Sequence, residues 1–164
     1  MTAVTGCSIR EAGDIDLPAL NQVIESAVMS WNLPERVKRL SLPSYYYDKA
    51  DLLHLTLLVA EKAGVGIVAV AGLEAADEAD IPLNSMGLLL HGLYVSPTLH
   101  NCGLGKQLLR RAEYYAAEAG YDGVLVKAQA EAVGFFRHRG YQVLPIEDDA
   151  RHYSHRLWKW LSIA

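Results

Sequence analysis

The stretch from Ser85 to Gly120 constrains the fold of this chain most. It starts with an apolar run over residues 86–95, which has the length and composition of a buried strand. A short turn-rich segment follows. From Leu104 onward apolar residues recur at helical spacing until Gly120, a residue typical of a helix end. The sequence therefore predicts a strand whose end leads directly into the N-terminus of a helix.

The predicted helix N-terminus is suited to a phosphate-bearing ligand. The first four N–H groups of a helix are unpaired and carry partial positive charge, which favours an anion. Gly103 and Gly105 let the main chain approach such a ligand closely. Two better-known phosphate loops are excluded. A P-loop needs glycine at position 100 and Ser or Thr at 107, and the dinucleotide fingerprint needs glycine at 108. The chain has His100, Gln107 and Leu108 there.

Two segments resemble motifs of the GCN5-related N-acetyltransferases. Residues 100–105, His-Asn-Cys-Gly-Leu-Gly, are similar to that family's pyrophosphate loop, which reads Gln or Arg, two residues, Gly, one residue, then Gly or Ala. Residues 129–141 are similar to its Asn-x-x-Ala-x-x-Phe-Tyr-x-x-x-Gly-Phe segment. The resemblance implies one domain over residues 1–164. Its fold would be α/β, with a mixed, mostly antiparallel, splayed sheet flanked by helices.

The same resemblance implies an enzyme that uses acetyl-CoA as co-substrate and no metal. It would transfer an acetyl group directly, in a ternary complex, to a primary amine of a small molecule or peptide. The residues that the resemblance assigns to coenzyme A are Leu93, Val95, His100, Asn101, Cys102, Gly103, Leu104, Gly105, Lys106, Gln129 and Phe136.

His91 is the candidate base of this reaction. An alkyl ammonium must lose a proton before it can attack a thioester, and an imidazole can accept that proton directly or through water. The alternative is a core histidine bonded to a backbone carbonyl. The resemblance also implies a splayed strand whose N–H groups, assigned to Leu93 and Val95, stabilise the oxyanion.

Three positions depart from the family pattern. His100 replaces Gln or Arg, Gln129 replaces Asn, and Phe136 stands where many relatives have a tyrosine that protonates the leaving thiolate. Tyr94, Tyr141 and His138 are candidate replacements for that acid. The departures at His100 and Phe136 keep open a second hypothesis, a catalytically silent acyl-CoA-binding domain used for sensing or assembly. Cys102 at a helix N-terminus suggests a reactive thiol, but direct transfer argues against an acyl-cysteine.

Aromatic residues near the N-terminus are candidates for the acceptor site. In the resembling family this region lies beside the acceptor, so Trp31, Tyr45 and Tyr46 are candidate substrate contacts. The alternative is ordinary packing. Three adjacent tyrosines, residues 45–47, cannot share one helical face.

Composition excludes several classes of protein. The net charge is −4 without a basic block, which argues against a nucleic-acid partner. The two cysteines do not form a disulfide framework, and no secretory leader is visible, so we expect a cytoplasmic protein. Residues 81–105 carry no formal charge, but proline and asparagine interrupt them, which argues against a membrane span.

The remaining chain supplies ordinary elements of a mixed fold. A strand at 7–10, a helix after Gly13, a hairpin of strands at 55–61 and 66–73, and an exposed acidic connection at 74–80 are expected. Later elements are a buried strand at 123–128, a helix at 130–139, and strands at 141–144 and 152–161. Trp158 and Trp160 would share a face of the last strand, as core residues or in a homodimer contact.

Overall fold

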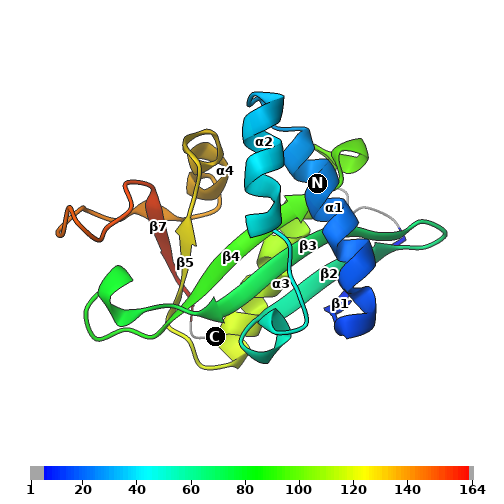
Figure 1. The fold of residues 1–164 in the computed structure, drawn as a ribbon. Coiled ribbons are helices and arrows are strands. Elements are labelled where there is room, and N and C mark those ends of the chain that lie inside the picture. The colour runs from blue at the N-terminus through cyan, green and yellow to red at the C-terminus, as the bar shows by residue number, and fades with distance from the viewer. Residues whose placement is uncertain (1–5, 163–164) are drawn as a thin grey trace. The chain divides into compact units, whose positions relative to one another are not determined.

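The computed structural model describes residues 6–162, which fall into two compact units. Residues 6–73 and 92–111 form the first unit, and residues 74–91 and 112–162 form the second. The strand β4 (Gly87–Val95) and the helix α3 (Leu104–Glu118) each contribute residues to both units. Figure 1 labels the helices and strands along the chain. The single domain over residues 1–164 stays a prediction.

The first unit contains an antiparallel sheet built on a hairpin. β1 (Cys7–Glu11) pairs with β2 (Thr56–Lys62), and β2 pairs with β3 (Gly66–Ala75). Gly64, with φ 77°, makes the tight turn between β2 and β3. The end of β4 lies next to β3, because the Ser96 N–H donates to the Val68 carbonyl at 2.8 Å. The hairpin predicted from the sequence is confirmed.

Helices cover the sheet of the first unit and bury its core. α1 (Leu17–Met29) follows the 3-10 helix η1 (Asp14–Asp16), and α2 (Glu35–Ser41) leads into the 3-10 helices η2 (Leu42–Ser44) and η3 (Asp51–Leu53). In Figure 1, α1 crosses in front of β2 and β3. The core on this face joins residues from α1 and the strands: Leu20, Val23, Ile24, Ala27, Val28, Leu57, Val59 and Val70. None of the helices within residues 6–162 has the length and apolar run that crossing a membrane requires.

The second unit contains the other part of the sheet. β4 pairs in parallel with β5 (Gly123–Lys127), β5 pairs with β7 (Arg156–Trp160), and β7 pairs with the short β6 (Gln142–Val143). The last two pairings are antiparallel, so the predicted mixed and mostly antiparallel sheet is confirmed. The 3-10 helices η4 (Glu78–Asp80) and η6 (Ala130–Ala132) and the helix α4 (Val133–Arg137) complete this unit.

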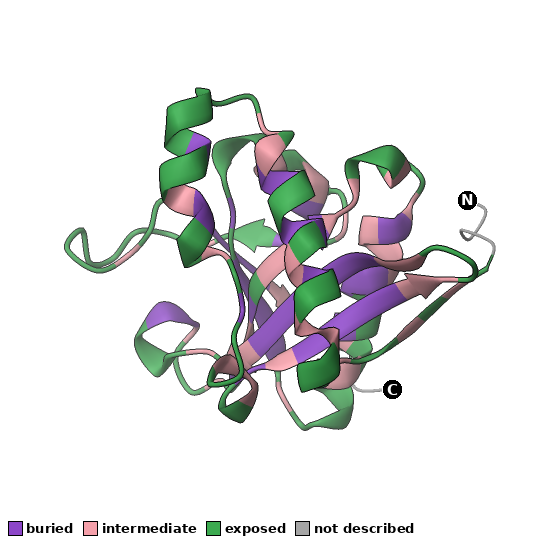
Figure 2. Ribbon diagram, turned by 45° about the vertical axis from the view of Figure 1, so that its right-hand side comes forward, coloured by how far each residue is buried: buried purple, intermediate pink, exposed green. Residues whose placement is uncertain are grey.

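The acidic connection after β3 is exposed at Asp77, Glu78 and Ala79, as the sequence predicts, but Asp80 departs from this expectation. Asp80 is buried at the end of η4, where its carboxylate pairs with Lys127 at 3.3 Å and with Arg151 at 3.2 Å. The buried guanidinium of Arg156 donates to the Asp80 backbone carbonyl. Because a buried charge needs partners, these cations explain how an acidic residue is accommodated here. Figure 2 shows buried residues along the strands and exposed residues on outer turns.

Two glycines of the second unit make room for a tryptophan. Gly87 of β4 lies opposite Gly123 of β5 in the register, and the indole of Trp158 covers both. A Cβ atom at Gly87 would lie 2.7 Å from Cζ3 of Trp158, and one at Gly123 would overlap the same ring. Trp158 is only 2% exposed, whereas its neighbour on the same face, Trp160, is 55% exposed. Trp158 is therefore a core residue, and its packing requires glycine on two strands.

Replacing Gly123 with alanine tests this packing. We expect Gly123→Ala to lower the free energy of unfolding by roughly 1–3 kcal/mol, because the added methyl group overpacks the Trp158 ring. Gly134→Ala is the matched control, since a Cβ atom there meets nothing within 4 Å and alanine favours the α4 helix. Urea unfolding followed by circular dichroism measures both. Equal stability of Gly123→Ala and the native protein would contradict the described packing.

Candidate functional site

The candidate site is built on the connection between β4 and α3. After Val95 the chain makes the 3-10 helix η5 (Pro97–Leu99), in which the Leu99 N–H donates to the Ser96 carbonyl at 2.9 Å. The loop then runs over residues 100–103 and α3 begins at Leu104. A strand end and a helix N-terminus are thus joined by a short, internally hydrogen-bonded connection, as the sequence predicts.

The loop backbone adopts two left-handed conformations. Asn101 has φ 64° and Gly103 has φ 79°, values that asparagine and glycine tolerate better than other residues. The N–H of Gln107 donates to the Gly103 carbonyl at 3.1 Å, so the first helical hydrogen bond starts directly at the loop. Leu104 is buried and anchors the helix, whereas His100, Asn101 and Cys102 are exposed. Leu104 thus fixes the start of the helix, while residues 100–102 of the loop before it are exposed.

The charge of this connection favours an anion. No carboxylate occurs between Ser96 and Gln107, and Lys106 in the first turn of α3 adds a cation to the positive end of the helix. Gly105 lies in the same turn, where the absence of a side chain leaves the backbone open. Backbone N–H groups of residues 101–106 can therefore hold a diphosphate. The thiol of Cys102 lies 3.7 Å from the His100 carbonyl, a contact within the loop itself.

The strand before the loop pairs with β5 over only part of its length. The register of β4 with β5 covers Gly87–Leu90 opposite Gly123–Val126, while β4 continues to Val95. Leu93 and Val95, the predicted oxyanion donors, lie beyond these four pairs and are half-buried. His91 is exposed and alternates with Leu93 and Val95 along one face of the strand.

Three of the predicted aromatic residues form a row in the first unit. The ring centroids of Trp31 and Tyr45 are 5.4 Å apart and those of Tyr45 and Tyr94 are 6.3 Å apart, both edge-to-face. Trp31 and Tyr45 are half-buried and Tyr94 is buried. Burial, with a smaller contribution from Tyr45, raises the pKa of the Tyr94 phenol far above its usual value. Tyr94 therefore keeps its proton at every physiological pH.

Tyr46 does not join this row. Its hydroxyl donates to Glu25 of α1 at 3.3 Å, and its side chain is exposed. Desolvation, followed by the charge of Glu25, raises the pKa of Tyr46. Tyr47 points into the core, and its backbone N–H donates to Asn21 at 3.0 Å. The three consecutive tyrosines thus take three different environments, as their spacing predicts.

The hydroxyl of Tyr141, in the second unit, is hydrogen-bonded to a partner that the sequence does not identify. This hydroxyl donates to the Glu113 carboxylate at 2.8 Å, and Lys159 pairs with the same carboxylate at 3.1 Å. Burial, then the charge of Glu113, raises the pKa of Tyr141 far above its usual value. Glu113 lies on α3. No local pattern links it to a tyrosine 28 positions away.

Phe136 and Gln129 lie at either end of the η6–α4 segment. The Phe136 ring is buried between Phe135 and Tyr141, with centroid distances of 5.1 and 5.5 Å. Gln129 is exposed immediately before η6, and its carbonyl accepts the Ala132 N–H at 2.9 Å. Gln129 thus has its side-chain amide at the surface, while Phe136 serves as a packing residue of this unit.

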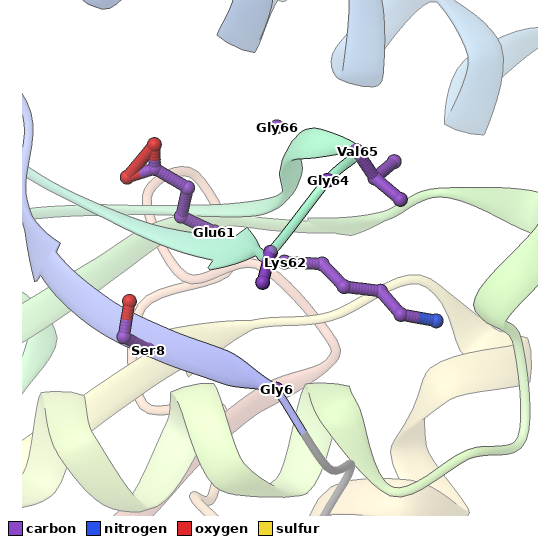
Figure 3. A pocket seen from close by; sticks show the side chains of 8 residues that line it. Gly6, Ser8, Glu61, Lys62, Gly64, Val65 and Gly66 are labelled. Carbon is purple, nitrogen blue, oxygen red and sulfur yellow. The ribbon is translucent and has the colours of Figure 1, made fainter.

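A surface hollow of about 450 Å³ lies at the turn between β2 and β3. Its lining comes from the start of β1 and the β2–β3 turn, and includes Ser8, Glu61 and Lys62. Figure 3 shows the Glu61 and Lys62 side chains pointing away from each other. Glu61 accepts a hydrogen bond from Arg10 at 2.9 Å. None of the predicted site residues lines this hollow.

Solved structures similar to this chain share one fold. An N-acetyltransferase described as PaiA from Thermoplasma acidophilum, in complex with coenzyme A, superposes with a TM-score of 0.71 at 18% identity, covering 94% of this chain and 98% of that one. A GNAT family acetyltransferase from Brucella melitensis, in complex with acetyl-CoA, gives 0.67 at 16% identity, with 96% and 89% covered. A GCN5-related N-acetyltransferase from Rhodopseudomonas palustris gives 0.72 at 19% identity, with 98% and 99% covered.

No curated protein matches the chain. A family model, in contrast, does match its sequence. The model described as the acetyltransferase (GNAT) family matches residues 24–141, which is more than half of the chain and includes the β4–α3 connection. This range and the shared fold agree with the motif resemblance at residues 100–105 and 129–141. The chain therefore belongs to the GNAT family of acetyltransferases.

Proposed function

We propose that this protein transfers an acetyl group from acetyl-CoA to a primary amine of a small molecule or peptide, by direct transfer in a ternary complex. The observation that carries the proposal is the β4–α3 connection, with its left-handed Asn101 and Gly103, its exposed loop and its lack of carboxylates. Two solved structures with this fold are complexes with coenzyme A or acetyl-CoA. No metal takes part in the proposed reaction.

The proposed coenzyme site follows the chain from strand to helix. Backbone N–H groups from Asn101 to Lys106 bind the diphosphate, and the side chains of His100 and Lys106 supply nearby donors. The main chain of Leu93 and Val95 binds the pantetheine arm. The motif resemblance at residues 129–141 adds Gln129 and Phe136 as expected coenzyme contacts. Acetyl-CoA supplies an activated acyl group as a thioester.

The proposed chemistry needs a base, an oxyanion site and an acid. His91 accepts a proton from the ammonium, directly or through water, and the neutral amine attacks the thioester carbonyl. The N–H groups of Leu93 and Val95 stabilise the oxyanion that forms, before the carbon–sulfur bond breaks. Tyr94 is favoured over Tyr141 as the donor to the thiolate, because Tyr141 already donates to Glu113. The proton that Tyr94 gives to the thiolate is replaced by the one that the attached nitrogen loses as the amide forms. The acceptor binds against Trp31 and Tyr45 rather than Tyr46, which is held by Glu25.

A silent acyl-CoA-binding domain is the second candidate. Phe136 favours this second candidate, because its phenyl ring has no proton to donate to a leaving thiolate. A thiol is a good leaving group, with an ordinary pKa of about 8.5, so loss of one acid need not abolish transfer. An acetyltransferase releases coenzyme A from acetyl-CoA when its acceptor is present, whereas a silent binding domain does not.

An acceptor screen tests the proposed function. The protein is incubated with acetyl-CoA and a panel of polyamines, aminoglycosides, amino acids and peptides, while thiol release and acetylated products are followed by absorbance and mass spectrometry. We expect release of coenzyme A in step with one class of acetylated amine. Tight binding of acetyl-CoA without release across the whole panel would instead support the silent domain.

Gly103→Ala tests the coenzyme loop. Alanine disfavours the left-handed conformation by roughly 1–2 kcal/mol, so the loop shifts and the dissociation constant of coenzyme A rises about tenfold. Gly64→Ala is the matched control, because Gly64 has nearly the same φ, 77° against 79°, but lies in the β2–β3 turn. Isothermal titration calorimetry measures both variants. If both substitutions weaken coenzyme A binding equally, the loss of affinity comes from lower stability of the fold and not from the loop.

His91→Ala tests the proposed base. Loss of a general base lowers turnover by roughly 10²–10⁴-fold, while the affinity for coenzyme A stays within about twofold of the native value. His54→Ala, at another exposed histidine, is the control. A turnover of His91→Ala that equals the native one from pH 6 to pH 9 would remove His91 from this role.

A further inference from the structure

Lys38 is a buried lysine in the first unit. It lies on α2 and is only 7% exposed, although lysine is among the residues least often buried. Its ammonium donates to the Met29 carbonyl at 2.8 Å and to the Trp31 carbonyl at 3.2 Å. The carboxylate of Glu35, one turn earlier on α2, lies at 3.6 Å. The two carbonyls accept hydrogen bonds from the ammonium and the Glu35 carboxylate pairs with its charge, which explains how the charge is accommodated.

Both carbonyls belong to the turn that ends α1. Met29 is the last residue of α1, where unpaired carbonyls carry partial negative charge and attract a cation. Trp31 follows two residues later, and its N–H donates to the Val28 carbonyl at 3.1 Å. The backbone of Trp31 is therefore fixed by two hydrogen bonds. Its carbonyl accepts one from Lys38, and its N–H donates one to Val28 of α1.

The position of Trp31 determines the aromatic row. Its ring meets Tyr45 edge-on, at an interplanar angle of 83° and a centroid distance of 5.4 Å, and Tyr45 in turn meets Tyr94. We propose that Lys38 is a positioning residue that sets Trp31 against Tyr45 and thereby shapes the acceptor-binding row; its link to the acceptor rests on the transferase activity proposed above. The residue acts through the backbone of Trp31 and does not itself contact the substrate.

The neighbouring residue Arg39 provides a matched control. It is also a cation on α2 and also pairs with Glu35, at 3.5 Å, but its side chain is 74% exposed. Arg39→Met therefore removes a charge and an ion pair with the same partner, without altering the donors to Met29 and Trp31. Any effect common to both positions reflects the charge of α2 and not the turn.

Two readouts test the proposal in the full-length protein. The chain contains three tryptophans, so labelling with 5-fluorotryptophan gives three fluorine resonances, and Trp31→Phe identifies that of Trp31. In Lys38→Met we expect the Trp31 resonance to shift while those of Trp158 and Trp160 stay in place. With the acceptor found in the screen, the KM for the acceptor should rise roughly tenfold or more, while the KM for acetyl-CoA changes by less than about twofold. Lys38→Arg, which retains a cation with several donors, should restore most of the acceptor KM.

The outcomes separate this proposal from the proposed function. An unmoved Trp31 resonance in folded Lys38→Met, or an equal shift in Arg39→Met, overturns the positioning role. A shifted resonance with an unchanged acceptor KM overturns the link to the acceptor. If the native protein acetylates nothing, the proposed function fails and the fluorine spectra alone decide whether Lys38 positions Trp31. If Lys38→Met does not fold, the same comparisons are made with Lys38→Gln.

Discussion

The positive N-terminus of α3 is the feature on which the proposed chemistry depends. Its backbone N–H groups are presented by a loop whose left-handed residues, Asn101 and Gly103, turn the chain out of β4 and into the helix. The buried Leu104 and the hydrogen bond from Gln107 to Gly103 fix the helix at this point. Main-chain donors of this kind depend on backbone shape more than on side-chain identity, which explains why His100 can replace the family's Gln or Arg.

Local patterns in the sequence predicted the elements that carry this site. The β2–β3 hairpin follows from two runs rich in Val, Ile and Leu around Gly64, and the α3 helix follows from apolar spacing that ends before Gly120. The family motif located the loop at residues 100–105 because that geometry is encoded in a few consecutive residues. The spacing of residues 45–47 likewise predicted that these tyrosines would diverge.

Contacts between distant residues could not be predicted in the same way. Asp80 was expected in an exposed loop but is buried, because cations at positions 127 and 151 neutralise it. Tyr141 was a candidate acid, but its hydroxyl donates a hydrogen bond to the Glu113 carboxylate. The sequence does not mark Lys38 as buried, since a lysine on a short helix ordinarily faces solvent. In each case a charged residue has its role set by a partner on another element, and nothing in the local sequence identifies that partner.

The packing of Trp158 over Gly87 and Gly123 has an evolutionary consequence. Three positions on three different strands share one volume, so none of them can change size alone. A relative with a smaller ring at position 158 could accept alanine at 87 and 123, whereas one that keeps the indole must keep both glycines. Substitutions at these three sites should therefore be correlated among the descendants of a common ancestor.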